Sequence, residues 1–202
     1  MKPSYRFYRR CYRIAYAILC IFFWFDVKGR ENMPEGAAMI CANHSSNTDP
    51  VFIALAVGID YFVHFIAKVE LFSKPVLSTV IIKLGAISID REMLGVATIK
   101  NILEYFKLGE KVGIFPEGTR ASKADYVAAK SGAVKIAERA NVPVVPIYLP
   151  RKKLMFRKFP VVIGEPYFIE KQSAKRSPED YAQLAGVLMS KIEALNPGNQ
   201  TA

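Results

Sequence analysis

Apolar and polar residues alternate in blocks along this chain, and from residue 37 onward the blocks switch between the periods of strands and helices. Short apolar runs typical of buried strands are followed by longer segments with helical periodicity, often with Pro near their start or Gly at their end. The predicted strands are 37–43, 61–68, 86–90, 111–116 and 142–149, with shorter ones at 159–164 and 167–170. The predicted helices are 49–58, 74–85, 95–109, 131–141 and 177–195. This alternation predicts an α/β fold with a largely parallel central sheet flanked by helices.

Residues at two helix ends support these boundaries. Asp49 suits the N-cap of the first of these helices, Pro50 suits its first helical position and Gly58 suits its end. Ser177 suits the N-cap of the last helix, with Pro178 after it and two acidic residues in its first turn.

The first 27 residues have a different pattern. They begin basic and become apolar, with no charged residue between Arg13 and Asp26. This apolar run has twelve residues, fewer than the roughly 18–20 that a spanning helix needs. No small-x-small cleavage site of a secretory signal peptide follows it. A helix through this segment places four arginines on one side, namely Arg6, Arg9, Arg10 and Arg13. Roughly opposite them lie three less polar residues, Tyr8, Cys11 and Ala15.

We therefore predict that residues 1–27 form an amphipathic, partly apolar helix that associates with the membrane surface. The association is monotopic and places the protein at the cytoplasmic face of the cell membrane. Residues 28–202 are then the catalytic domain, beginning with a charged, Gly- and Pro-containing linker at 28–36. The alternative is a hydrophobic first helix that simply packs onto the domain.

Composition limits the partners. A chain of 202 residues with 51% hydrophobic and 23% charged residues is long enough for one compact domain, and it is neither disordered nor polytopic. Its net charge of +10 suits nucleic acid, anionic lipid headgroups or a phosphorylated substrate. Against nucleic acid, the basic residues are scattered and no recognisable binding motif appears. Three cysteines without a C-x-x-C pair and only two histidines give no metal-ligand cluster, and a reduced cytosolic compartment fits.

Polar clusters follow three of the predicted strands. His44 comes just after 37–43, Arg91 follows 86–90, and "EGTR" (117–120) follows 111–116. In sheets of parallel strands, sites form beyond the carboxyl ends of the strands, so the three clusters are expected to face one crevice.

His44 and Asp49 have the residue types of a general base and the group that orients it. An imidazole, with an ordinary pKa near 6.5, accepts a proton from a hydroxyl near neutral pH, and a carboxylate on its other nitrogen fixes the tautomer. A spacing of five on one helix separates two side chains by about 140°, but a strand–loop–helix junction lets His44 fold back onto Asp49. The alternative is an ordinary loop histidine and a helix cap.

A second candidate site is the stretch "FPEGTRAS" (115–122). Gly118 permits a tight backbone with exposed amides. Arg120 offers a planar fork that matches a phosphate, and Arg91 is a second basic residue at a strand end. A polar turn with a solvated arginine is the alternative.

Together these segments resemble the glycerolipid acyltransferase superfamily. "NHSSNTDP" (43–50) is similar to its H-x-x-x-x-D motif, and "GAISIDR", "FPEGTRA" and "VPVVPI" are similar to its second, third and fourth blocks, in the same order. The resemblance covers about residues 27 to 170 and is best to the bacterial 1-acyl-glycerol-3-phosphate (lysophosphatidate) acyltransferase type.

The resemblance implies an acyltransferase that acts on lysophosphatidate in phospholipid biosynthesis and produces phosphatidate. His44 would take the proton from the free hydroxyl of the acceptor, and Asp49 would orient His44. The hydroxyl would attack the thioester of acyl-CoA or acyl carrier protein, which is a substrate; no cofactor or metal is implied. Arg91 and Arg120 would hold the phosphate of the acceptor, in a pocket that Glu117, Gly118 and Thr119 help to form.

Other functions stay open at this point. The acceptor of the same chemistry could be glycerol-3-phosphate or another lysolipid. A lipase or thioesterase would use a serine nucleophile, but neither Ser45 nor Ser46 lies in a G-x-S-x-G elbow. A non-enzymatic, basic membrane-binding protein would not need His44.

Overall fold

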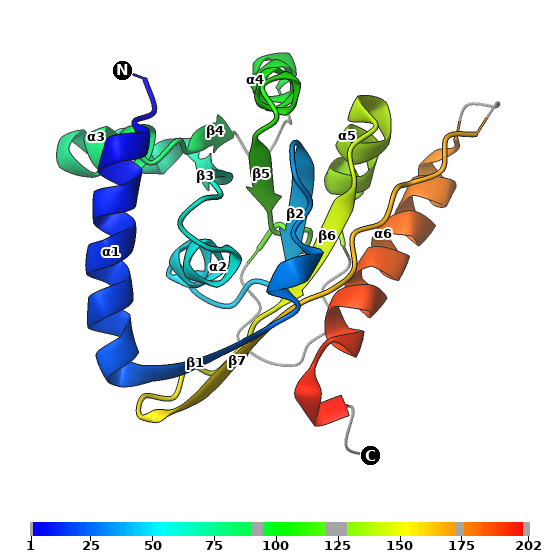
Figure 1. Ribbon diagram of the computed structural model, residues 1–202. Coiled ribbons are helices and arrows are strands. Elements are labelled where there is room, and N and C mark those ends of the chain that lie inside the picture. The colour runs from blue at the N-terminus through cyan, green and yellow to red at the C-terminus, as the bar shows by residue number, and fades with distance from the viewer. Residues whose placement is uncertain (1, 90–94, 120–128, 173–175, 200–202) are drawn as a thin grey trace.

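The computed structural model describes residues 2–89, 95–119, 129–172 and 176–199, and seven strands of this part of the chain form one sheet (Figure 1). Their order is β1-β7-β6-β2-β5-β3-β4. Neighbouring strands are parallel, and only β6 and β7 run antiparallel among the described strands. The strands are β1 (Phe23–Lys28), β2 (Ala38–Ala42), β3 (Val63–Lys68), β4 (Ile87–Ile89), β5 (Lys111–Ile114), β6 (Val144–Tyr148) and β7 (Arg157–Ile163). The predicted fold class, a largely parallel sheet between helices, is confirmed.

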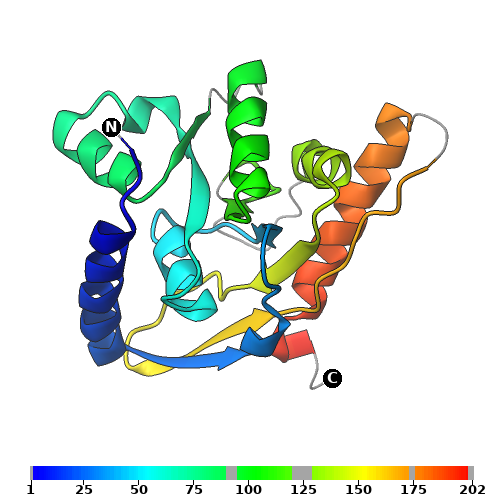
Figure 2. The ribbon, with the colours of Figure 1, turned by 45° about the horizontal axis from the view of Figure 1, so that its top comes forward.

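The helices cover both faces of this sheet (Figures 1 and 2). α4, α5 and α6 pack against one face, and α2 packs against the other with α1 outside it. α3 lies beside the N-terminal end of α1, where the Ser4 amide donates to the Lys83 carbonyl. The helices are α1 (Tyr5–Phe22), α2 (Asp49–Val57), α3 (Pro75–Lys83), α4 (Val96–Lys107), α5 (Gly132–Ala140) and α6 (Pro178–Ala194), and short 3₁₀ turns lie at Arg30–Asn32, Val69–Leu71 and Pro197–Asn199.

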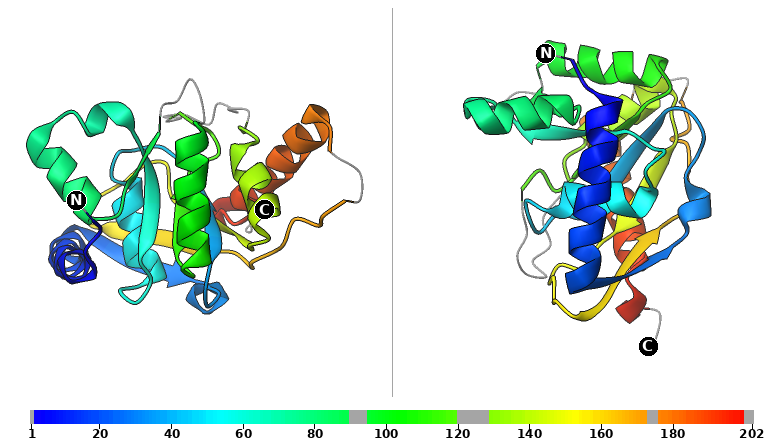
Figure 3. Two further views of the ribbon diagram at one scale, coloured as in Figure 1. Left: turned by 90° about the horizontal axis from the view of Figure 1, so that it is seen from above. Right: turned by 60° about the vertical axis from the view of Figure 1, so that its left-hand side comes forward.

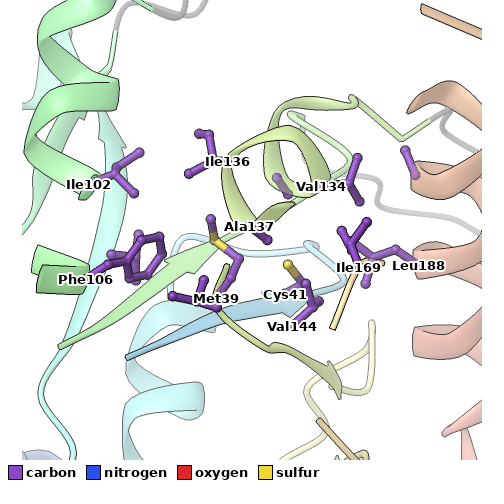
Figure 4. Packing of buried hydrophobic residues seen from close by; sticks show 14 of the residues in the cluster. Met39, Cys41, Ile102, Phe106, Val134, Ile136, Ala137, Val144, Ile169 and Leu188 are labelled. Carbon is purple, nitrogen blue, oxygen red and sulfur yellow. The ribbon is translucent and has the colours of Figure 1, made fainter. Parts of the chain in front are cut away.

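Two hydrophobic clusters, one on each face, hold the sheet. Met39 and Cys41 of β2 point toward the helices α4, α5 and α6 (Figure 4). Ala38, Ile40 and Ala42, at the alternate positions, point toward α2 and β7. Because β2 is covered on both faces, its sequence is a continuous apolar run rather than an alternating one. The Ser177 cap of α6 forms as predicted: the Ser177 hydroxyl accepts from the Asp180 amide, and the Asp180 carboxylate accepts from the Ser177 amide.

The N-terminal helix is shorter than predicted. It ends at Phe22, and Phe23–Lys28 form edge strand β1 beside β7 instead of the last turns of a helix. The side chains explain the change: Phe23 is buried against Phe52 and Phe159, while Trp24, the next residue, faces outward. This period of two is that of a half-buried strand. The predicted strand at 167–170 is also wrong, since only Tyr167 pairs, in a single bridge to Val144.

One side of α1 packs onto the domain. Tyr8 is buried and donates its hydroxyl to the Tyr61 carbonyl at 2.9 Å, and Tyr12 donates to the Leu55 carbonyl at 3.1 Å. α1 lies along the outside of the molecule (Figure 3). On its predicted basic side, Arg6, Arg10 and Arg13 are exposed, and Arg9 pairs with Asp60 of the domain at 3.1 Å. Over the described residues, no helix has both the length and the apolar character to cross a membrane. The division into a membrane-associating segment and a catalytic domain stays a prediction.

Candidate functional site

Three loops meet at one edge of the sheet. β2 lies between β5 and β6 and runs parallel to both, so the loops after these three strands leave from the same edge. They are residues 43–48, 115–119 and 149–156. Asn43 ties the first loop to the third, because its side chain donates to the Leu149 carbonyl and accepts from the Leu149 amide, each at 2.8 Å. Two of the three polar clusters predicted to face one crevice, His44 and the first residues of "EGTR", therefore lie at the same edge of the sheet.

The His44 side chain is fixed against Asp49. Its Nδ1 lies 2.9 Å from Asp49 Oδ2, and the side chains are 8% and 0% exposed. The imidazole also stacks on Phe115, with ring centres 4.0 Å apart. Asp49 was predicted to cap α2, but Thr48 occupies the cap position and makes no side-chain cap bond. The carboxylate instead accepts from the loop amides of Ser45 and Ser46, at 2.7 and 2.8 Å, which folds the loop back as the pairing requires.

Lys153, in the loop between β6 and β7, also contacts Asp49. Its Nζ lies 2.5 Å from Asp49 Oδ1 and donates to Ser45 Oγ at 2.9 Å, and its side chain is 12% exposed. Burial by itself raises the pKa of Asp49. Hydrogen bonds from His44, Lys153 and the two loop amides outweigh that effect, so the pKa lies below its ordinary value and the carboxylate is ionised.

Little in the sequence indicates a role for Lys153. It stands in the run Arg151–Lys153, and three adjacent basic residues usually indicate a solvated surface. The one available signal was position, because the run follows the strand 142–149 and strands of this kind carry sites at their carboxyl ends.

Glu117 of the "EGTR" segment points inward. It is 2% exposed and pairs with Arg151 at 3.0 Å, and Arg151 also pairs with Glu193 of α6 at 2.7 Å. Burial raises the pKa of Glu117, and the charge of Arg151 opposes this only in part. The geometry therefore makes Glu117 a tether between the second loop, the third loop and α6.

Gly118 is required by its surroundings. Its φ is +67°, and a Cβ there would lie 2.8 Å from Lys130 Cε. Its amide donates to the Phe115 carbonyl at 3.0 Å, so this amide is engaged in the turn and not directed at a substrate. Thr119 is exposed. Arg91 and Arg120, predicted to hold a phosphate, lie outside the residues that the structure describes.

A cavity of about 710 Å³ opens beside this site. His44, Phe115 and Gly118 line it where it meets the catalytic loops. The rest of its wall is mostly apolar and comes from the inner sides of α1, α2 and α3 and from β3, with Lys68 and Lys130 as cationic contributors. The tyrosine face of α1 is therefore part of a cavity wall as well as a packing surface.

The second histidine, His64, lies elsewhere and has structural contacts. Its Nδ1 is 2.9 Å from the Gly85 carbonyl, its ring stacks on Tyr105, and burial lowers its pKa. Among the described residues, no group of His, Cys, Asp and Glu has the arrangement of a metal site.

Comparison with known proteins finds similar acyltransferases. A family model described as "Acyltransferase" matches residues 25–150. The 1-acyl-sn-glycerol-3-phosphate acyltransferase of Bacillus subtilis is 34% identical over 195 residues, which are 93% of this chain and 96% of that protein. A probable enzyme of the same name from Mycoplasma pneumoniae is 36% identical over 122 residues, 58% of this chain and 46% of that protein. The crystal structure of PlsC, the 1-acyl-sn-glycerophosphate acyltransferase of Thermotoga maritima, superposes with a TM-score of 0.68 and 25% identity, covering 96% of this chain and 80% of that one.

Proposed function

The chain belongs to the acyltransferase family, as its four motifs indicated, and we propose that it forms phosphatidate. It transfers a fatty acyl group from an acyl thioester to the free hydroxyl of 1-acyl-glycerol-3-phosphate. The observation that carries the proposal is the buried His44–Asp49 pair at the wall of a large apolar cavity. Such a pair supplies a base, and such a cavity accepts an acyl chain.

His44 acts as the general base. Asp49 is ionised and accepts at Oδ2, so Nδ1 of His44 carries the proton and Nε2 is left with a free lone pair. Nε2 takes the proton from the hydroxyl of the acceptor while that oxygen attacks the thioester carbonyl carbon. The tetrahedral intermediate collapses with cleavage of the C–S bond, and the proton passes from His44 to the departing thiolate. Asp49 stabilises the imidazolium between these two steps.

The cavity receives an acyl chain of the substrates. Its volume of about 710 Å³ lies within the usual range of ligand sites, and its apolar wall excludes water from the chain. The stacking of His44 on Phe115 places the base at the boundary between this wall and the polar loops. The carbonyl carbon of an acyl chain bound in the cavity thus lies at its mouth, beside the base.

The phosphate of the acceptor binds on the cationic side of the site. Lys68, Lys130 and Gly118 line the cavity, and Gly118 lies beside Lys130. Arg91 and Arg120 complete the phosphate site in this proposal, as the resemblance of their motifs implies. The donor is acyl-CoA or acyl carrier protein, and no cofactor is required.

The enzyme works at the cytoplasmic surface of the cell membrane, where its lipid acceptor resides. The exposed arginines of α1 face anionic headgroups, and its apolar positions enter the interface. The helix attaches the domain to one leaflet.

The proposal is tested by acyl transfer with the purified protein in detergent micelles. Labelled acyl-CoA is offered with lysophosphatidate, with glycerol-3-phosphate and without an acceptor. We expect labelled phosphatidate from the wild type and a loss of at least 1,000-fold, roughly, in His44→Ala, which removes the base. His64→Gln, the other histidine, is the matched control, and it retains activity if it folds.

Each other outcome has a clear meaning. Label on glycerol-3-phosphate or another lysolipid would keep the reaction and change the acceptor. Free fatty acid without an acceptor would indicate a hydrolase. A folded His44→Ala protein with wild-type activity would remove His44 as the base, and failure with both acyl-CoA and acyl carrier protein would refute the enzyme.

A further inference from the structure

The loop between β6 and β7 exposes three consecutive large apolar side chains. Leu154, Met155 and Phe156, which we name the β6–β7 tip, are 53%, 57% and 60% exposed. Single apolar residues are common on protein surfaces, but adjacent ones on a projecting loop indicate a contact surface.

The tip is held in place against the end of α1. The Phe156 amide donates to the Phe22 carbonyl at 2.6 Å, and the two rings pack with centres 5.9 Å apart. Phe156 has a φ of +57°, a conformation that bulky residues rarely adopt. The packing of the domain core does not require this strained backbone conformation, because the Phe156 side chain is exposed.

The tip continues an exposed apolar stripe of α1. The outward side of this helix is basic in its N-terminal half and apolar in its C-terminal half, where Ile14, Ile18 and Ile21 are exposed. The tip lies beside the C-terminal end of α1 (Figure 1). Phe22 connects this stripe to the tip, because its ring packs against Phe156. We name the exposed residues Ile14, Ile18, Ile21 and Phe22, together with the tip, the apolar corner.

Exposed basic residues flank the tip along the chain. Lys152 and Arg157 are exposed on either side of it, and Lys158 follows with a long, 3.6 Å contact to Asp26. Apolar side chains ringed by exposed lysine and arginine match the two layers of an anionic lipid leaflet, with hydrocarbon inside and phosphate outside. The charge and the apolar corner both favour lipid over a second copy of this chain, which carries the same positive charge.

We propose that the β6–β7 tip inserts into an anionic lipid bilayer as a second point of attachment beside the C-terminal half of α1. The inference rests on the proposed function for its choice of a lipid partner. One helix leaves the domain free to rotate about the helix axis, whereas a second contact fixes this rotation. The outer side of α1 then stays against the leaflet, and the cavity lies directly behind this helix.

A fluorescent reporter tests insertion directly. Trp24 is the single tryptophan of the chain, so Trp24→Phe combined with Met155→Trp places the only reporter on the tip. We expect a blue shift and strong quenching on vesicles of phosphatidylcholine and phosphatidylglycerol with brominated acyl chains. The control pairs Trp24→Phe with Leu108→Trp, since Leu108 is 73% exposed after α4 on the opposite face of the sheet. A vesicle-bound protein whose tip reporter is not quenched would overturn the proposal.

Vesicle affinity tests the energetic contribution of the tip. Leu154→Ser/Phe156→Asn removes two apolar groups, and asparagine tolerates the left-handed backbone at 156. We expect it to bind these vesicles at least tenfold, roughly, more weakly, because burial of one large apolar side chain already changes affinity by about that factor. Leu108→Ser, the matched control, binds as the wild type does. Lys152→Gln and Arg157→Gln each lose about fivefold, and only when phosphatidylglycerol is present.

Four outcomes separate this proposal from the proposed function. Equal vesicle affinity of the wild type and the tip variant overturns the insertion, as does a lipid-free wild-type dimer that the tip variant abolishes. With a short-chain, water-soluble lysophosphatidate, the tip variant is expected to keep the wild-type kcat/KM. If the wild type inserts its tip but transfers no acyl group, the proposed membrane contact is retained and the proposed acyltransferase function is refuted.

Discussion

Replacement of Lys153 by methionine tests the shortest charged contact at the site. The ammonium lies 2.5 Å from a carboxylate oxygen of Asp49, which is fully buried. With an effective dielectric constant of about 20, their attraction is roughly 7 kcal/mol before desolvation. Removal of both ions from water offsets several kcal/mol of this. We therefore expect Lys153→Met, which retains the length of the side chain, to lower the free energy of unfolding by about 3 kcal/mol.

The size of this loss depends on pH in a defined direction. Burial raises the pKa of Asp49, but the bonds from His44, Lys153 and the loop amides bring it below its ordinary value. A depressed carboxyl pKa stabilises the folded state above the unfolded-state value of about 3.9, and this stability is lost as the pH falls through the folded-state pKa. The difference between the wild type and Lys153→Met is therefore full at neutral pH and narrows below about pH 4.

Urea unfolding, followed by circular dichroism at pH 7 and below pH 4, measures this difference. Lys152→Met is the control: Lys152 is exposed in the same loop, and its replacement is expected to change stability by less than about 0.5 kcal/mol. If Lys153→Met is as stable as the wild type, or if its deficit does not vary with pH, the reasoning is refuted, because the contact then contributes no charge-dependent stability.

Two more substitutions test the geometry of the loops. Asp49→Asn puts an amide among four donors, from His44, Ser45, Ser46 and Lys153, and it removes the charge that stabilises the imidazolium. We expect kcat to fall by about 10³–10⁴ with the fold retained. Activity near that of the wild type would show that the charge is not used. Gly118→Ala puts a Cβ on a left-handed backbone, 2.8 Å from Lys130. We expect the free energy of unfolding to fall by about 1–2 kcal/mol, seen as a lower Tm. An unchanged Tm would contradict the tight turn.

Local patterns were sufficient to predict most of the fold. The strands β2, β3 and β5 and the helices after them were predicted because their apolar runs, Pro starts and Gly ends depend only on neighbours in the chain. β1 was missed because its aromatic residues continue the apolar run of α1 without a break. The choice between helix and strand there depends on Phe52 and Phe159, which lie far away in the sequence.

In the site, too, contacts between neighbours in the sequence were predictable and contacts between distant segments were not. The pairing of His44 with Asp49 was predicted because one loop brings them together. Lys153 and Arg151 were not, because they reach the loops after β2 and β5 only through the return of the chain after β6. The inward position of Glu117 was likewise hidden, since its partner is Arg151 rather than a substrate.

The position of α1 has a consequence for altering the protein. Cys11 and Ala15 on its inner side line the cavity, while Ile14 and Ile18 on its outer side face away from the domain. Enlarging Ala15 or Cys11 would shorten the space for a fatty chain without changing the outer side. In the proposed membrane orientation, polar substitutions at Ile14 or Ile18 would change the contact with the leaflet without changing that space. Under this proposal, chain-length preference and leaflet affinity are separately adjustable from one helix, whereas deletion of the helix would abolish both at once.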